Sequence, residues 1–219
     1  MRDFTPQTAR QLVGRDDGRV LEIGANDGED TQRFLDAFPT GTIHCFEPDP
    51  RAIARWRARI HDSRATLHEM AICERTGLAT LYLSGGTPPG ECWKGYGEWD
   101  KSNSVLPFDR HGDNAPWMEC GKQTIECPCM TLDDWASHHP GSWDFAWIDV
   151  QGAEGLVIRG GQETFHRIRY AFLECDPRPN YRDQAKLREL RAVMTRLRFK
   201  YRGQHAGFNH LWENRHFDS

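Results

Sequence analysis

A turn rich in glycine and acidic residues is the clearest candidate for chemistry in this sequence. The segment VLEIGANDGED places Gly24 and Gly28 on either side of Asn26, directly after a short apolar run. A dinucleotide-binding turn needs a further glycine, so that a pyrophosphate can approach the helix N-terminus closely. Here that position is Glu29, with Asp30 beside it, and two carboxylates repel a pyrophosphate. The turn favours a ligand without phosphate at this place and disfavours a NAD-dependent oxidoreductase.

Two further carboxylates suit a nucleoside with a charged amino-acid end. Glu22 precedes the turn, so that its carboxylate and the backbone carbonyls can meet the ammonium group of S-adenosylmethionine. Glu47 follows the next apolar run, where nucleotide-binding folds place an acid that accepts hydrogen bonds from the ribose hydroxyls. The alternative for Glu47 is a helix-capping or surface acid. The turn and the acid together predict a site for S-adenosylmethionine.

Acidic residues later in the chain are candidates for activating a methyl acceptor. An alcohol must lose its proton during methyl transfer, which requires a general base or a metal ion. Asp149 ends an apolar run and is the candidate base, with Glu154 as a second catalytic candidate. The alternative for Glu154 is to complement a helix dipole. Asp149, Glu174 and Asp176 could together bind Mg²⁺, but we favour simpler roles at a strand end and a turn.

Histidine and tryptophan offer further candidates. The histidines that could serve as a base instead are His111, His138, His139, His205 and His210. Because the chain has 10 histidines, none of them stands out. The tryptophans Trp93, Trp99 and Trp117 could stack on a sugar ring, or they could pack in the interior.

The order of apolar segments predicts an α/β fold that positions these residues. Runs of strand type occur at 19–24, 42–47, 65–72, 78–84, 144–150 and 170–175. Helical spacing precedes Pro39 and occurs again at 50–60, 133–139, from about 153, and at 187–197. The segments 199–203 and 210–214 predict an antiparallel hairpin at the end of the chain. Repeated β-α-β units predict a mainly parallel sheet with helices on both faces and ligands at the carboxyl ends of its strands.

The segment 84–123 is rich in glycine and tryptophan and has no sustained period. Loops this long are uncommon in compact domains unless they cover a site, bind a ligand or are disordered. Since disordered segments usually lack aromatic residues, we expect a folded, lid-like insertion in a single domain that spans 1–219. The alternative is a small satellite core packed against the sheet.

Composition limits the location and the partners. The chain has 219 residues, 38% of them hydrophobic, and a net charge of −4. It has no apolar run of the roughly 20 residues that span a membrane and no apolar N-terminal stretch typical of a signal peptide. We therefore expect a cytoplasmic protein with reduced cysteines and no membrane partner. The mixed charges argue against a nucleic-acid partner, and no pattern predicts an oligomeric state.

Several motifs, in this order along the chain, resemble the FkbM family of S-adenosylmethionine-dependent methyltransferases. They are VLEIGANDGEDT, CFEPDP, MAICERTGLATLYLS, SNSVLP, TLDDW and WIDVQGAEGLVIRGG, within about 20–176. The most specific element is the pair of a GAN-x-G turn with a late I-D-V-x-G-A-E segment. The resemblance implies a Rossmann-like class I methyltransferase fold. It also implies an O-methyltransferase that acts on a hydroxyl of a small molecule or glycan, such as a sugar or polyketide.

The resemblance also implies the roles of individual residues. The methionine moiety would lie among Glu22, Gly24, Asn26 and Gly28, with Glu47 at the ribose. Met70 and Ala71 would flank the adenine, Ser102, Asn103 and Ser104 would lie near the cofactor, and Asp149 would lie beside the sulfonium. The chain departs from the family pattern at Trp147 and Gln151, where lysine and glutamate are common. The alternative is therefore a non-catalytic S-adenosylmethionine-binding or S-adenosylhomocysteine-binding protein that acts through protein contacts.

Overall fold

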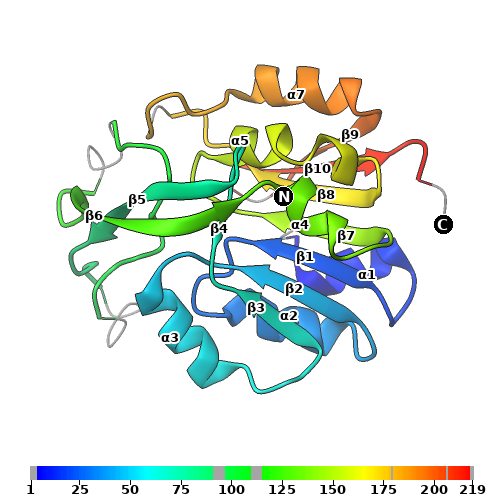
Figure 1. The fold of residues 1–219 in the computed structure, drawn as a ribbon, viewed down its shortest axis with the longest axis horizontal. Coiled ribbons are helices and arrows are strands. Elements are labelled where there is room, and N and C mark those ends of the chain that lie inside the picture. Colours follow the sequence, from blue (N-terminus) through cyan, green and yellow to red (C-terminus); the bar gives the residue numbers. More distant parts are fainter. Residues whose placement is uncertain (1–3, 91–96, 110–114, 179, 206, 218–219) are drawn as a thin grey trace.

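A seven-stranded sheet in the order β3-β2-β1-β7-β8-β10-β9 forms the centre of the protein (Figure 1). The computed structural model describes residues 4–90, 97–109, 115–178, 180–205 and 207–217. The parallel strands are β1 (Arg19–Ile23), β2 (Thr42–Phe46), β3 (Ala65–His68), β7 (Trp143–Ile148) and β8 (Ile168–Glu174). The strands β9 (Phe199–Gln204) and β10 (Asn209–Asn214) form an antiparallel hairpin beside β8. The predicted mainly parallel sheet and its C-terminal hairpin are therefore confirmed.

Helices cover both faces of this sheet (Figure 1). One face carries α1 (Pro6–Val13), α2 (Glu29–Ala37) and α3 (Pro50–Arg59). The other carries α4 (Leu132–Ser137), α5 (Glu154–Arg159), α6 (Gln162–Phe165) and α7 (Leu187–Arg196). Successive residues of β1 alternate between the two layers, since Val20 packs with the first group and Leu21 with the second. None of the helices in the described residues is long and apolar enough to cross a membrane.

The sequence analysis did not predict α1. Its start is set by Thr5, whose hydroxyl accepts from the backbone N–H of Thr8, and by Pro6 in the first turn. Gly14 ends the helix in a left-handed conformation with φ of 78°. Just before the helix, Phe4 stacks on Phe172 of β8, with ring centroids 4.4 Å apart. The N-terminal segment is thereby fixed to the central sheet.

The prediction of one strand over 65–72 was wrong. The chain bends after β3, where the Met70 N–H donates to the His68 carbonyl at 2.9 Å, and so cannot continue the same strand. The residues after the bend form β4 (Ala71–Ile72), which belongs to a second sheet of order β4-β6-β5. The bend carries Met70 and Ala71 to the carboxyl ends of the large sheet's strands.

The predicted insertion 84–123 begins and ends in strands of the second sheet. The main strands of this sheet are β5 (Gly77–Gly85) and β6 (Glu119–Met130), which pair antiparallel. Their buried side has its own apolar cluster, made of Ala71, Cys73, Leu81, Cys127 and Cys129. Both ends of the segment 84–123 are therefore strands, and the described part between them folds back through a bridge between Tyr82 and Ser104.

Candidate active site

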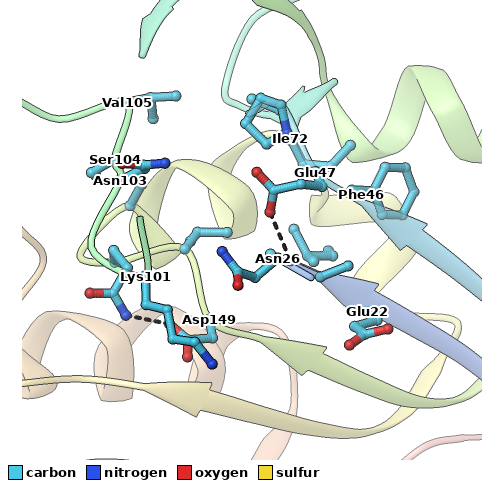
Figure 2. A pocket seen from close by; sticks show the side chains of 18 of the residues that line it. Glu22, Asn26, Phe46, Glu47, Ile72, Lys101, Asn103, Ser104, Val105 and Asp149 are labelled. Atoms are coloured by element: carbon cyan, nitrogen blue, oxygen red, sulfur yellow. Dashed lines mark hydrogen bonds between the residues drawn. The ribbon is translucent and has the colours of Figure 1, made fainter. Parts of the chain in front are cut away.

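A cavity opens at the carboxyl ends of β1, β2 and β7. Its wall includes the turn after β1, the end of β2, the bend before β4, the segment 100–105 and the start of the loop after β7. In Figure 2, Asn26, Glu47 and Asp149 surround this space, and Asn103 and Ser104 lie across it from Phe46 and Ile72. We call this the first pocket.

The turn after β1 requires glycine at its first position. Gly24 has a φ of 94°, and an ideal Cβ on it would overlap the carbonyl oxygen of Asp149. Both Gly24 and Ala25 donate their N–H groups to the carbonyl of Phe46 at 3.0 Å. The turn thus joins the ends of β1, β2 and β7 at one point.

Gly28 lies between two residues of the first pocket, Asp27 and Glu29. It has a φ of 79° at the start of α2, and a Cβ on it would lie 2.8 Å from Trp56 Cδ1. It is not among the residues that line the first pocket. Gly28 allows α2 to pack closely against α3 and so contributes to the shape of the turn.

Glu47 is buried at the cavity wall and holds the glycine turn. Its Oε2 accepts from the Asn26 N–H at 2.9 Å, and its Oε1 accepts from the Asp49 N–H at 2.8 Å. Burial raises the pKa of Glu47 to about 7, although these two hydrogen bonds stabilise its ionised form. Each oxygen keeps a lone pair for a further donor, such as a hydroxyl of a bound ligand.

Asn26 carries an acceptor that a ligand can satisfy. Its Oδ1 is buried at the first pocket and accepts no hydrogen bond from the described residues. A buried polar atom without a partner is costly. The ammonium group and the ribose hydroxyls of S-adenosylmethionine are donors that would satisfy it. The polar part of the pocket therefore fits this cofactor.

Glu22 also lines the first pocket, and its carboxyl group is hydrogen-bonded to two residues outside that pocket. Its Oε2 accepts from the Thr31 hydroxyl at 2.6 Å and from Cys45 Sγ at 3.3 Å. Complete burial raises its pKa to about 8, so the protonated form is favoured near neutral pH.

The far end of the first pocket is apolar. Met70, Ala71, Ile72, Leu81 and Val105 line it, and these side chains suit the flat face of an adenine. Of the predicted serine-rich stretch, Asn103 and Ser104 line this pocket, whereas Ser102 does not. The Ser102 hydroxyl instead accepts from Trp99 Nε1 at 2.9 Å.

A second pocket adjoins the first, because Lys101 and Gln151 line both. Gln151 adopts a left-handed backbone conformation with φ of 53°. Its Nε2 donates to Asp149 Oδ1 at 2.7 Å and to Glu174 Oε2 at 2.9 Å, while its Oε1 accepts from the Tyr181 hydroxyl at 3.1 Å. This residue therefore connects the cofactor side of the site with the second pocket.

Acidic groups crowd the second pocket. The negative charge of Asp149, followed by burial, raises the pKa of Glu174 to about 10. Burial raises the pKa of Glu154 to about 8, and its Oε1 accepts from the N–H groups of Val150 and Gly152. Glu154 thus lines the second pocket and holds the loop after β7. At neutral pH, Glu174 carries a proton next to Asp149.

The three acids considered for Mg²⁺ do not share one set of partners. Asp149 and Glu174 are joined through Gln151, whereas Asp176 pairs with Arg178 and Asn180. In the described part of the chain, one set of three His, Cys, Asp or Glu side chains brings its ligand atoms within 4.8 Å of one another. That set is His44, His68 and His139, which line neither pocket.

Of the histidines and tryptophans considered as bases or ring-stacking groups, those in the described residues lie outside both pockets, except Trp99. His138, His139, His205 and His210 line neither pocket. His111 and Trp93 fall outside the described residues. Trp99 lines the second pocket. The ring of Trp117 packs edge-on against the ring of Trp99, with centroids 5.5 Å apart.

Sequence reasoning missed Tyr181 and Lys101, and it noted Gln151 only as a departure from a pattern. Tyr181 comes from the loop after β8, and Lys101 comes from the connection between β5 and β6. No local spacing signals that these residues meet. Trp147, the other departure, lines the first pocket and packs on Phe172 with centroids 4.6 Å apart.

The strand order and the pocket at the strand ends are those of the class I methyltransferase fold. The family described as Methyltransferase FkbM domain matches residues 22–201. The chain is 37% identical over 182 residues to the 2-O-methyltransferase NoeI of Sinorhizobium fredii (strain NBRC 101917 / NGR234), covering 82% of this chain and 72% of that protein. The protein therefore belongs to the FkbM methyltransferase family, and it is an enzyme.

Comparison with solved structures agrees on the fold. The crystal structure of Methyltransferase FkbM from Methylobacillus flagellatus KT superposes with a TM-score of 0.59 at 14% sequence identity. The match covers 96% of this chain but spans 48% of that protein's length.

Proposed function

We propose that this enzyme transfers the methyl group of S-adenosylmethionine to a hydroxyl group of a sugar or another hydroxyl-rich small molecule or glycan. The observation that carries the proposal is the position of Asp149. It lines the first pocket and shares the Gln151 amide with Glu174, which lines the second. A relative at 37% identity is named a 2-O-methyltransferase, which supports a hydroxyl as the acceptor.

The first pocket would hold the cofactor. Glu47 would accept from the ribose hydroxyls, and Asn26 Oδ1 and Glu22 would face the methionine moiety. Met70, Ala71 and Ile72 would pack on the adenine. When bound, the cofactor supplies a methyl group already activated by a positive sulfur. The chain's own task is to align an acceptor with that carbon and to exclude water.

The second pocket would hold the acceptor. Its lining combines the indole of Trp99 with polar groups from Glu174, Asp176, Asn180 and Tyr181. A sugar presents an apolar ring face and several hydroxyls, so it can both stack on the indole and donate to the acids.

Asp149 would take the proton of the acceptor hydroxyl. The negative charge of Asp149 raises the pKa of Glu174 to about 10, so Glu174 keeps its own proton at neutral pH and does not compete as the base. Gln151 fixes both carboxyl groups and is a positioning residue. We favour this route over a Mg²⁺ ion because the third acid, Asp176, is paired with Arg178.

The segment 97–109 would act as a fixed cover over both pockets, within a single domain. Asn103 donates to Asp49 at the start of α3, and Asp100 pairs with Arg55 of the same helix. These contacts tie the cover to the helix next to the cofactor pocket. The acceptor would thereby meet a preformed wall.

The decisive experiment combines cofactor binding with methyl transfer. Calorimetry should detect binding of S-adenosylmethionine and of S-adenosylhomocysteine, and labelled methyl should pass into one class in a panel of sugars and glycans. Absence of binding of either compound would contradict the cofactor site. Binding without transfer to any hydroxyl compound would instead support the non-catalytic alternative, which membership of a methyltransferase family does not favour.

A further inference from the structure

Three histidines from distant parts of the chain meet beside the central sheet. His44 lies on β2, His68 ends β3, and His139 follows α4. His44 Nδ1 lies 3.0 Å from His68 Nε2, and one ligand atom from each of the three lies within 4.8 Å of the others. Tetrahedral Zn²⁺ with bonds of 2.0–2.1 Å places two nitrogen ligands about 3.3 Å apart. The three rings are therefore close to a ligand arrangement and need only small movements.

Aromatic packing holds the rings in this arrangement. Trp135 stacks on His139, with centroids 4.1 Å apart and an interplanar angle of 12°. The same indole meets His44 and His68 edge-on, at 5.1 and 5.2 Å. Phe46 stacks on the other side of His68 at 4.8 Å. Little side-chain freedom remains to be lost when an ion binds.

The hydrogen bond of His139 leaves one of its nitrogens free to bind a metal. Its Nδ1 lies 2.8 Å from the carbonyl oxygen of Trp135. A carbonyl can only accept, so Nδ1 carries the hydrogen and Nε2 presents its lone pair. Metal-bound histidines commonly show this arrangement, in which the second ring nitrogen donates to a carbonyl.

The three rings also remain accessible to an ion from solvent. Each of the three histidines is half-buried rather than sealed, so an ion can reach them.

We propose that His44, His68 and His139 bind one Zn²⁺ ion, with a water molecule as the fourth ligand. Three neutral imidazoles favour an ion such as Zn²⁺ over Mg²⁺ or Ca²⁺, which prefer oxygen. The guanidinium of Arg19 lies 4.1 Å above the ring of Trp143, which meets His44 edge-on at 5.3 Å. This positive charge opposes a cation, so the site requires an ion with strong affinity for nitrogen.

The ion would join three elements beside the cofactor pocket. His44 and His68 lie on the strands that end near Phe46 and Met70, and both of these line the first pocket. Binding therefore stabilises the folded chain, because the unfolded chain does not hold the three rings together. The proposal does not depend on the methyl acceptor or on the cofactor.

Metal uptake by the full chain, without a histidine tag, tests the proposal. After removal of metals with a chelator, the protein is titrated with ZnCl₂ against a coloured competitor, and bound zinc is measured by elemental analysis. We expect one zinc per chain, and at least about 100-fold weaker binding in His68→Gln and His139→Gln. The matched control is His138→Gln, since His138 adjoins His139 but is exposed and does not belong to the group of three. Zinc should bind this control as it binds the wild type.

Measurements on the unaltered protein keep the test valid if a variant does not fold. The imidazole NMR signals of three histidines should shift on addition of one equivalent of Zn²⁺. The Co²⁺ form should lack the strong near-ultraviolet bands of thiolate ligands, which distinguishes the histidines from the cysteines of the second sheet. No stoichiometric uptake, unchanged uptake in both ligand variants, or thiolate bands would each overturn the proposal.

Discussion

The carboxyl groups of Asp149 and Glu174 accept hydrogen bonds from one nitrogen atom, Nε2 of Gln151, at 2.7 and 2.9 Å. This shared donor holds two acids close enough that the charge on Asp149 is the main cause of the raised pKa of Glu174. One proton is therefore retained by the pair at neutral pH. Near the expected position of the transferred methyl group, the site combines an acceptor of protons with a neutral carboxylic acid.

Asp149→Asn should stop turnover and keep cofactor binding. The amide has the same shape but cannot accept the hydroxyl proton, and loss of a general base typically costs 10²–10⁴-fold in rate. Labelled methyl transfer measures the rate, and calorimetry with S-adenosylhomocysteine measures binding. Asp36→Asn, at an exposed position of α2, is the control. Wild-type turnover in Asp149→Asn would remove this residue from the mechanism.

Gln151→Glu should destabilise the protein at pH 8 more than at pH 5. The substitution replaces a donor to two acids with a third acid, so the folded state must bury another charge or bind a proton. The expected cost at pH 8 is about 1–3 kcal/mol in the free energy of unfolding. The cost should shrink at pH 5, where the new carboxyl group is more readily protonated. Urea denaturation at both pH values measures this, with the exposed Gln162→Glu as control.

Glu47→Gln should weaken cofactor binding by at least about 10-fold, equivalent to about 1.4 kcal/mol. Both carboxylate oxygens accept backbone N–H groups, from Asn26 and Asp49. A glutamine must turn its own NH₂ toward one of these donors, which disturbs the glycine turn. Calorimetric titration with S-adenosylhomocysteine provides the measurement. Glu69→Gln, an exposed position, should bind normally, and equal affinity in the two variants would argue against a ribose role for Glu47.

Glu22→Gln should flatten the dependence of stability on pH. Burial raises the pKa of Glu22 to about 8 in the folded state, above its ordinary value of 4.5. The folded chain therefore binds this proton more tightly, and the resulting stability is lost as pH rises from about 5 through about 8. The loss for one such group is roughly 1 kcal/mol per pH unit across this window.

Glutamine at this position can still accept from Thr31 but does not ionise. The free energy of unfolding at pH 5, 6.5 and 8 should show a smaller slope in Glu22→Gln than in the wild type. Glu163→Gln lies on the exposed side of α6 and should keep the wild-type slope. Identical slopes in all three proteins would show that Glu22 does not titrate in this range.

Gly24→Ala should prevent folding or reduce soluble yield severely. Its Cβ would overlap the carbonyl oxygen of Asp149, and neither backbone can move without separating the ends of β1 and β7. Gly97→Ala is a matched control, since Gly97 also has a positive φ, 85°, but has open space around its Cβ position. We expect that control to cost only about 1–2 kcal/mol. Expression level, circular dichroism and thermal unfolding compare the two, and a normally folded Gly24→Ala would contradict the close approach.

The sequence predicted those elements whose signals are local. The helix after Asp49 begins where the cap and proline indicated, and β1 and β7 are apolar runs. The break after His68 was missed because no glycine or proline marks it and apolar residues resume at Met70. The second sheet was missed because β6 pairs with β4 and β5, which lie far from it in the chain. Pairing between distant segments depends on the tertiary fold.

The same distinction applies to the candidate site. Gly24, Asn26 and Glu47 lie at strand ends, and the general rule for α/β sheets leads to them directly. Gln151 and Tyr181 meet only because two loops converge, and the histidine cluster joins residues that no spacing rule relates. The family resemblance placed Gly28 and Ser102 near the cofactor; Gly28 packs against Trp56 and Ser102 lines the second pocket, contacts that the motifs alone do not indicate.

The three-stranded sheet has a separate apolar cluster, yet the connection between its long strands supplies Lys101 and Asn103 to the pockets. The length and composition of that connection can change without altering the strands that bear the glycine turn. Exchange of the connection between β5 and β6 could then change the preferred acceptor, while the glycine turn of the first pocket stays the same. A chimera that carries a relative's 86–118 segment would be the natural starting point for redirecting this enzyme to other acceptors.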